Sequence, residues 1–218
     1  MNPARAGWVQ SPSADPAGHA AGPSAEEPPA ITWSMSQTDA GERIRPALPS
    51  DCEAVAALYA GYVRDSLATF ELVAPTPDEW RSKLEGLDQV SLPFLVAIIG
   101  DELLGYALVT PWRPRPGYRF TVEDSIYIDP RHTGHGHGRR LMQELLVCVR
   151  AWGATQVIAV IADSGDAASP ALHRSCGFVE VGRLRQVGFK QGRWVDTLLM
   201  QLSLEDAADQ RVRGPAVT

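Results

Sequence analysis

The sequence is poor in the features that define several classes of protein. Only 3 of its 218 residues are cysteine, an odd number at wide spacing, which argues against a disulfide framework and a zinc knuckle. No hydrophobic run approaches the roughly 20 residues that a membrane-spanning helix needs. Residues 1–40 also lack the basic start and apolar stretch of a secretory signal. We therefore expect a cytoplasmic protein with no membrane partner.

Basic residues are outnumbered as well. The chain has 20 Lys and Arg against 26 Asp and Glu, a net charge of −6. Much of the acidic excess lies in residues 1–40, where Arg5 is the only basic residue, and the middle of the chain is nearly neutral. A nucleic-acid binder is expected to carry a clustered basic patch, so the sequence predicts no nucleic-acid partner.

The length fits one domain with extensions at both ends. Residues 1–40 are dominated by Ala, Pro, Gly and Ser and bury too little apolar surface to offset the entropy of ordering. We predict a disordered extension over 1–40, within which Met35 is a candidate start, one domain over 41–204, and a flexible tail over 205–218.

Hydrophobic periodicity and turn residues predict an alternation of strands and helices. Ser50 with Glu53 is interpreted as a capping box at the start of the first helix, and Thr76 with Glu79 as another at the start of the second. Gly153 is expected to end the third helix. The order β-α-α-β-β-β-α-β-α-β-β predicts an α/β fold, a mixed central sheet flanked by helices. The expected strands cover 42–48, 94–99, 103–112, 119–130, 156–162, 178–189 and 194–204, and the third and fourth helices cover 139–153 and 170–175.

A strand, a glycine-rich turn and an amphipathic helix follow one another in SIYIDPRHTGHGHGRRLMQELL. Gly134, Gly136 and Gly138 permit a tight turn that directs backbone N–H groups toward one point, where the helix start adds positive partial charge. This pattern predicts a phosphate-binding loop. Arg139 and Arg140 lie in the first helical turn, where the helix dipole disfavours cations, so we expect an anionic ligand nearby.

Other interpretations of this turn are less consistent with the sequence. A Walker loop would end in Gly-Lys-Ser/Thr, and a dinucleotide-binding loop has a different glycine spacing. His132, His135 and His137 have no acidic or cysteine partner at ligand spacing, so no metal is expected. A purely structural turn remains an alternative from these residues alone.

The turn resembles the acetyl-CoA pyrophosphate loop of the GNAT N-acetyltransferases, whose Arg/Gln-x-x-Gly-x-Gly/Ala pattern falls here on Thr133, Gly136 and Gly138. Thr133 departs from the usual Arg or Gln. PWRPRPGYRFTVEDSIYIDPRH and VGRLRQVGFKQGRWVDTLLMQL resemble the phosphinothricin acetyltransferase family, and the likeness runs from about Ile44 to Leu204. The resemblance implies the GNAT acyl-CoA N-acyltransferase fold, acetyl-CoA as co-substrate and a homodimer. The implied acceptor is amino-acid-like: phosphinothricin, methionine sulfone or methionine sulfoximine.

The resemblance also assigns catalytic residues. The family's TxES motif is similar to TVEDS here and places its carboxylate on Glu123, which we expect to assist removal of a proton from the acceptor amine. Asp124, on the opposite face of the strand, is given only a minor role. His173 stands where many GNAT enzymes have a tyrosine that assists the departing thiolate, and Tyr127 is a second candidate. His173 is alternatively a helix-surface or acceptor-contacting residue.

Binding residues follow from the same resemblance. Asp166 replaces the family's usual asparagine, and an ionised carboxylate cannot donate a hydrogen bond. We therefore expect the cofactor contact to shift to Ser164 or Ser169, or the affinity for acetyl-CoA to fall. Backbone amides between Ile126 and Ile128 are expected to polarise the thioester carbonyl. The full expected cofactor set is Ile126, Tyr127, Ile128, Thr133, Gly134, His135, Gly136, His137, Gly138, Arg139, Asp166 and Ser169.

The expected acceptor set is Phe70, Arg113, Arg115 and Tyr118. Arginine forms paired hydrogen bonds with carboxylates and phosphinates, which favours an anionic acceptor over a polyamine. Two alternatives stay open: acetylation of another small amine, and a non-catalytic acyl-CoA-binding module. Retention of Glu123 favours an enzyme over the binding module.

Overall fold

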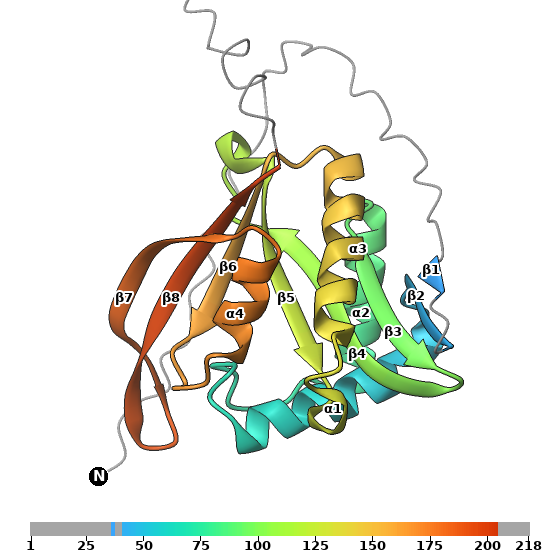
Figure 1. The fold of residues 1–218 in the computed structure, drawn as a ribbon, viewed down its shortest axis with the longest axis horizontal. Helices are drawn as coiled ribbons and strands as arrows, with labels where there is room; N and C mark the ends of the chain where they lie inside the picture. Colours follow the sequence, from blue (N-terminus) through green and yellow to red (C-terminus); the bar gives the residue numbers. More distant parts are fainter. Residues whose placement is uncertain (1–35, 38–40, 205–218) are drawn as a thin grey trace, which may run out of the picture.

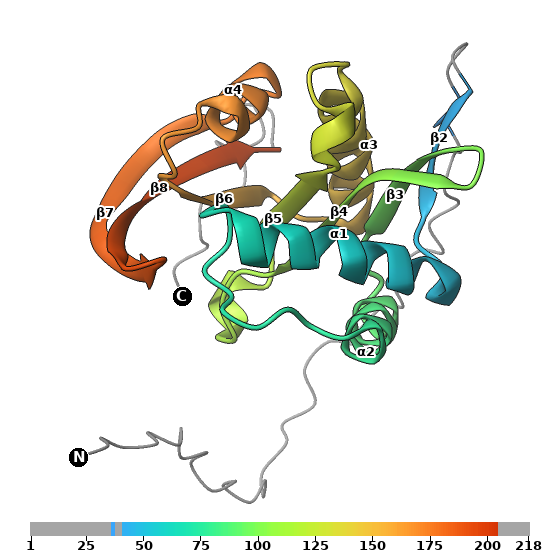
Figure 2. The same ribbon diagram turned by 90° about the horizontal axis from the view of Figure 1, so that it is seen from below.

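The computed structural model describes residues 36–37 and 41–204. They form one mixed sheet in the order β1-β2-β3-β4-β5-β6-β8-β7, with helices on both faces (Figures 1 and 2). The α/β fold predicted from the sequence is confirmed. The strands are β1 (Ser36–Gln37), β2 (Glu42–Pro46), β3 (Phe94–Ile99), β4 (Glu102–Pro111), β5 (Thr121–Ile128), β6 (Gln156–Ala162), β7 (Val179–Lys190) and β8 (Arg193–Ser203). The helices are α1 (Cys52–Asp65), α2 (Pro77–Gln89), α3 (His137–Trp152) and α4 (Ala168–Ser175), with short 3-10 turns at Pro49–Asp51, Pro116–Tyr118 and Pro130–His132.

One neighbouring pair of strands, β5 and β6, runs parallel, and the other pairs are antiparallel. Parallel neighbours need a long crossover connection, and α3 supplies it. Figure 2 shows α1 and α2 on one face of the sheet and α3 and α4 on the other. The two faces of β5 therefore look toward different pairs of helices.

The helices bury the apolar stripes expected from their periodicity. On α1 the buried positions include Val55, Tyr59 and Val63, each four residues from the next, so they lie on one face. On α3, Leu141 and Leu145 are fully buried and pack the helix against the sheet. The hydrophobic core is thus divided between the two faces of the central strands.

The two expected capping boxes have different outcomes. Thr76 and Glu79 form the predicted box: the Thr76 side chain accepts a hydrogen bond from the Glu79 amide, and the Glu79 carboxylate accepts one from the Thr76 amide. The Ser50 and Glu53 box was wrong. A 3-10 turn precedes α1, and Asp51 accepts the hydrogen bond from the Leu48 amide at 2.7 Å. Asp51 is held for this role by the Arg45 guanidinium at 2.6 Å.

The ends of the described chain add one element that the sequence did not predict. Ser36 and Gln37 pair with β2, within the extension expected to be disordered; an edge strand can be extended through backbone hydrogen bonds alone, without hydrophobic side chains. The other residues of 1–40 and the tail over 205–218 lie outside the described residues. Within residues 36–37 and 41–204, no helix is both long enough and apolar enough to cross a membrane.

Candidate active site

A cleft opens where β5 and β6 separate. The two strands pair only from Thr121 with Gln156 to Asp124 with Ala159, and beyond that point they spread apart (Figure 1). The gap is part of a cavity of about 690 Å³ lined by both strands, the loop before α3, α4, and residues of α1 and the α1–α2 loop. Because β5 pairs with β4 along its whole length but leaves β6 after Asp124, backbone groups on its open edge face this cavity.

The glycine-rich turn has the backbone geometry that a phosphate-binding loop requires. Gly134 and Gly136 have φ of +80° and +82°, values at which a side chain would be strained. Gly136 is the residue before α3, a helix of 16 residues. The N–H groups in the first turn of α3 have no partner within the helix, and they lie at the end of the helix that borders the cleft,. A Cβ on Gly138 would lie 3.3 Å from Ile128, so this position needs a small residue for close packing on β5.

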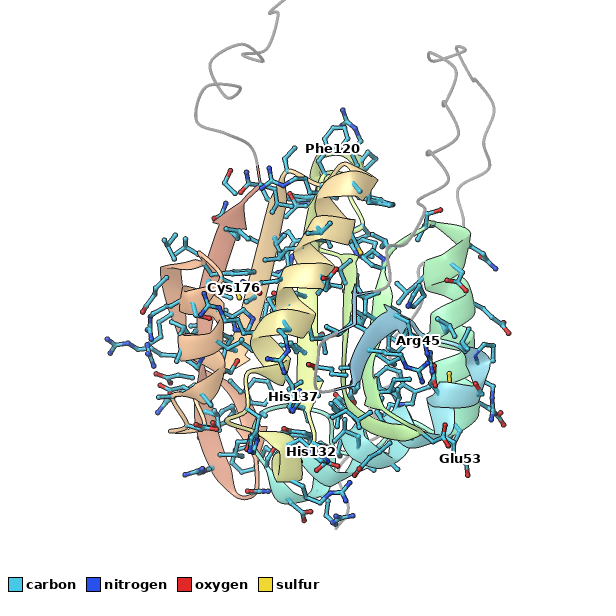
Figure 3. The ribbon with its side chains drawn as sticks, turned by 45° about the vertical axis from the view of Figure 1, so that its right-hand side comes forward. Arg45, Glu53, Phe120, His132, His137 and Cys176 are labelled. Carbon is cyan, nitrogen blue, oxygen red and sulfur yellow. The ribbon has the colours of Figure 1, made fainter. Side chains whose placement is uncertain are left out.

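Most of the expected cofactor residues of the loop line the cavity, but His135 does not. Its carbonyl accepts a hydrogen bond from Arg140 instead. The Thr133 hydroxyl donates to the Pro130 carbonyl at 3.0 Å, so this side chain closes the turn. His132, which was not expected in the site, also lines the cavity; its ring lies 6.3 Å from that of His137, at the same end of α3 (Figure 3).

A buried carboxylate holds the first turn of α3. Glu42 of β2 has a side chain only 1% exposed, and its two oxygens lie 2.5 Å from Nε of Arg140 and 2.9 Å from Nδ1 of His137. The sequence had predicted an anionic ligand beside Arg139 and Arg140. Arg140 has a partner that the sequence did not predict, Glu42, whereas Arg139 lines the cavity, and the anionic ligand itself stays a prediction.

Glu123 faces the α1 and α2 side of the sheet and lines the large cavity. Burial is the main cause that raises the pKa of Glu123 above its ordinary value, and the neighbouring Asp124 charge adds to it. The positive charges of Arg113 and Lys83 act in the opposite direction. A carboxylate with a raised pKa accepts a proton more readily near neutral pH, which is the property required of a general base.

Asp124 and His173 form a buried pair on the other face of β5. Nε2 of His173 lies 3.0 Å from Oδ2 of Asp124, and the two side chains are 3% and 1% exposed. Nδ1 of His173 lies 2.8 Å from the Ser169 carbonyl. Since both ring nitrogens face acceptors, the geometry fits a doubly protonated imidazolium. Burial lowers the pKa of His173, but the Asp124 hydrogen bond and charge outweigh it, so the net shift is upward.

This pair changes the interpretation of both residues. The helix-surface alternative for His173 was wrong, because the side chain is buried and lines the cavity. Asp124 is a cavity residue that sequence reasoning gave only a minor role. Its Oδ1 atom is buried and has no hydrogen-bond partner within residues 36–37 and 41–204.

Aromatic side chains form the wall of the cleft on the α1 side of β5, on the face opposite to His173. Tyr127 packs edge-on against Tyr59 and Tyr62, with ring centroids 5.0 Å away in both cases. Burial raises the pKa of Tyr127 far above its ordinary range. The Tyr62 hydroxyl donates a hydrogen bond to the Ile128 carbonyl at 2.6 Å. This carbonyl lies in the part of β5 that no longer pairs with β6, so Tyr62 supplies its partner.

The structure places only one of the four residues expected to bind the acceptor at the cavity. Phe70 lines the cavity and packs on β7, where a Cβ added to Gly188 would lie 2.1 Å from its ring. Arg113, Arg115 and Tyr118 lie on the loop between β4 and β5 and are not among the residues that line the cavity. Arg113 stacks on Trp112 with its guanidinium 4.4 Å from the ring centroid.

The start of α4 forms another part of the lining. Asp166 accepts a hydrogen bond from the Ala168 amide at 2.9 Å and so stabilises the turn into the helix. Ser164 and Ser169, the two alternative donors, both line the cavity. Both serines therefore line the same cavity as Asp166. Among the described residues, no group of three His, Cys, Asp or Glu side chains could hold a metal ion.

Comparisons with known proteins agree on one family. Residues 59–178 match the model of the acetyltransferase (GNAT) family. The chain is 46% identical over 161 residues to phosphinothricin N-acetyltransferase of Alcaligenes faecalis, covering 74% of this chain and 82% of that protein. It is 36% identical over 165 residues to L-methionine sulfoximine/L-methionine sulfone acetyltransferase of Salmonella typhimurium, covering 76% and 96%.

Solved structures give the same result for the fold. A GNAT superfamily phosphinothricin acetyltransferase from Sinorhizobium meliloti, in complex with acetyl-CoA, superimposes with a TM-score of 0.73 at 36% identity. The superposition covers 77% of this chain and 91% of that one. The similarity therefore extends over nearly the whole described domain.

Proposed function

This chain belongs to the acetyltransferase (GNAT) family, and from that premise we propose that it transfers the acetyl group of acetyl-CoA to the α-amine of an amino-acid-like acceptor. The acceptors that its relatives' names support are phosphinothricin, methionine sulfone and methionine sulfoximine. The observation that carries the proposal is the position of Glu123 on the wall of the cavity that the glycine loop and the separated strands enclose.

The residues of the cleft fit acetyl-CoA. The α3 N-terminus with Gly134 and Gly136 supplies N–H groups for the pyrophosphate,. The open edge of β5 supplies backbone groups for the arm of the molecule. A volume of about 690 Å³ is large enough for a ligand of this class to be mostly enclosed,. Acetyl-CoA supplies an activated thioester, and the chain holds and polarises it.

Glu123 is the proposed general base. An amine attacks only when it is neutral, so the acceptor ammonium must lose a proton first. Glu123 accepts that proton, directly or through water. The amine nitrogen then forms a bond to the acetyl carbon and loses a second proton, the carbon–sulfur bond breaks, and the departing thiolate takes up one proton. Glu123 thus acts before bond formation, and no covalent intermediate on the protein is required.

Backbone amides of β5 between Ile126 and Ile128 are proposed to stabilise the negative charge that develops on the thioester oxygen. His173 is proposed to assist departure of the thiolate. Since Asp124 and the Ser169 carbonyl hold its nitrogens, it donates a proton only after exchanging one of these bonds. Tyr127, with its strongly raised pKa, keeps its proton at neutral pH and is the alternative donor.

The acceptor is proposed to lie on the Glu123 face of β5, under Phe70. Arg113 is near enough to Glu123 to affect its pKa, which supports a position for the acceptor's acidic group between that arginine and the cavity. Arg115 and Tyr118 of the same loop are proposed to complete this contact. The Arg113 side chain has to leave Trp112 to reach a ligand, so we expect its orientation to differ when the acceptor is bound.

The function is tested by thiol release from acetyl-CoA with the purified protein. The panel contains phosphinothricin, methionine sulfone, methionine sulfoximine, the common amino acids and spermidine. Turnover concentrated on the first three supports the proposal. Turnover mainly on spermidine contradicts the acceptor class, and no turnover with retained acetyl-CoA binding favours a binding module.

We further propose a homodimer in the cytoplasm. The β7–β8 ribbon exposes large apolar side chains to solvent, and such a patch is typical of an interface. Light scattering at several concentrations tests the dimer, and cell fractionation tests the location. The exposed apolar residues of the ribbon are Val179, Val181, Leu184, Val187, Phe189 and Trp194.

A further inference from the structure

The segment between α1 and α2 forms one wall of the large cavity. Residues 68–71 of this segment all line the cavity, yet they belong to no helix or strand. No ladder of backbone hydrogen bonds therefore fixes their position. Other contacts have to do so, and the place of Phe70, the proposed wall of the acceptor site, depends on them.

Thr69 is the centre of these contacts and is only 7% exposed. Its side-chain oxygen lies 2.6 Å from the Tyr59 hydroxyl of α1 and accepts a hydrogen bond from the Glu71 amide at 3.2 Å. Its carbonyl oxygen accepts another hydrogen bond from Nζ of Lys190 at 2.7 Å. Thr69 thus joins the segment to α1 on one side and to β7 on the other.

Lys190 is the last residue of β7 and is only 4% exposed. Lysine is almost never buried without a partner, because its ammonium then loses the water around it. Among residues 36–37 and 41–204, the carbonyl of Thr69 is the acceptor that Lys190 contacts, and no carboxylate forms an ion pair with it. A buried ammonium is therefore directed at one carbonyl of the cavity wall, 121 positions away in the sequence.

The same face of β7 also holds Phe70 by packing. A Cβ added to Gly188 would lie 2.1 Å from the Phe70 ring, so the ring lies directly against the backbone of the strand. Gly188 and Lys190 are two positions apart and share a face, whereas Phe189 between them is 54% exposed. One face of β7 thus makes two neighbouring contacts with the segment, to Thr69 and to Phe70.

We propose that Lys190 is a positioning residue for the acceptor, because its hydrogen bond to Thr69 sets the place of Phe70 in the cavity wall. Lys190 does not line the cavity, so it acts through the segment and not by touching the acceptor. The inference rests on the proposed function, since it assumes that Phe70 contacts the acceptor. Acetyl-CoA is proposed to bind along β5 and the glycine loop, away from this contact.

Lys190→Met removes the N–H donors and keeps an unbranched side chain. We expect KM for phosphinothricin and methionine sulfone to rise by about tenfold, the effect of roughly one charge-assisted hydrogen bond. KM for acetyl-CoA should stay the same, which also shows that the variant is folded. Arg193→Met is the control, because Arg193 pairs with Lys190 across the β7–β8 turn but is exposed. An unchanged KM for the acceptor in Lys190→Met, or an equal rise in both KM values, overturns the proposal.

A double-mutant cycle shows whether Lys190 acts through Phe70. In a Phe70→Leu background the wall is already altered, so Lys190→Met should raise KM for the acceptor much less than it does in the parent. Effects that simply multiply would mean that the two residues act independently and would overturn the proposal. Lys190→Arg keeps N–H donors and should retain more affinity for the acceptor than Lys190→Met. An arginine variant no better than the methionine variant contradicts a role for the hydrogen bond.

Hydrogen exchange separates this inference from the proposed function, because it needs no acceptor. The Glu71 amide bonds to the Thr69 side chain, so its exchange reports the position of the segment. We expect faster exchange in Lys190→Met than in the parent or in Arg193→Met, and unchanged exchange would show that Lys190 does not hold the segment. If the parent acetylates none of the proposed acceptors, the proposed function is wrong, whatever the exchange rates are.

Discussion

Oδ2 of Asp124 lies 3.0 Å from Nε2 of His173, and the pair is almost completely buried between β5 and α4. The bond joins a strand of the cofactor cleft to the helix that borders it on the other side. Because Nδ1 is held by the Ser169 carbonyl, the ring has a fixed orientation. We regard Asp124 as a positioning residue that acts through His173.

Asp124→Asn should destabilise the protein strongly. The change removes one partner of a buried charged pair and leaves the other uncompensated, a loss of roughly 3–5 kcal/mol in comparable cases. The free energy of unfolding in urea measures it. Asp65→Asn is the control, because Asp65 pairs with Arg64 on the surface and exposed pairs contribute at most about 1 kcal/mol. Similar losses in both variants would contradict a buried ion pair.

The same pair predicts how stability depends on pH. The pKa of His173 is raised in the folded protein, whereas an unfolded histidine titrates near pH 6.5. The folded state thus binds the proton more tightly, so this contribution is fully present below about pH 6.5 and is lost as the pH rises through the folded pKa. We expect the difference in unfolding free energy between the parent and His173→Gln to shrink above that window. A difference that is constant with pH argues against a charged imidazole.

Glu42→Gln tests the support of the glycine loop. The neutral amide cannot balance Arg140, so the first turn of α3 should lose its fixed position while the core stays intact. We expect KM for acetyl-CoA to rise by about tenfold, the effect of roughly one charge-assisted hydrogen bond, and kcat to change little. Glu53→Gln on the exposed side of α1 (Figure 3) is the matched control. An unchanged KM for acetyl-CoA in Glu42→Gln would show that the loop is held without this carboxylate.

Gly188→Ala should disturb Phe70, because the new Cβ would lie 2.1 Å from its ring. Overpacking of this kind costs about 1–3 kcal/mol, and moving Phe70 should raise KM for the acceptor more than KM for acetyl-CoA. Gly182→Ala on the same strand meets no atom within 4 Å and serves as control. Steady-state kinetics with each substrate varied in turn provides the measurement. Equal KM values for the acceptor in both variants would show that Phe70 does not contribute to acceptor binding.

Local signals in the sequence predicted local structure well. Thr76 with Glu79 and the three glycines around the start of α3 act through neighbours a few residues away, so their pattern is visible in the sequence. The Ser50 and Glu53 box does not form, because Asp51, held by two hydrogen bonds from Arg45, caps the turn before α1 instead. The local capping pattern contains no sign of Arg45.

Contacts between distant residues were not predictable in this way. Asp124 and His173 are 49 positions apart, and Glu42 and Arg140 are 98 apart. Nothing in the spacing of either pair indicates that the sheet brings them together. The resemblance placed the family's carboxylate on Glu123, but it gave no indication that Asp124 and His173 are buried together on the opposite face of β5.

Glu123→Gln distinguishes an enzyme from a binding module. The amide keeps the size of the side chain but cannot accept the amine proton, and general-base assistance contributes about 10²–10⁴-fold to a rate. We expect kcat to fall within that range while the Kd of acetyl-CoA, measured by calorimetry, stays the same. In the parent, kcat/KM should rise with pH through the raised pKa of Glu123, and this limb should be absent from the variant. A variant with parental kcat would exclude Glu123 as the base and would transfer that role to another group of the cleft.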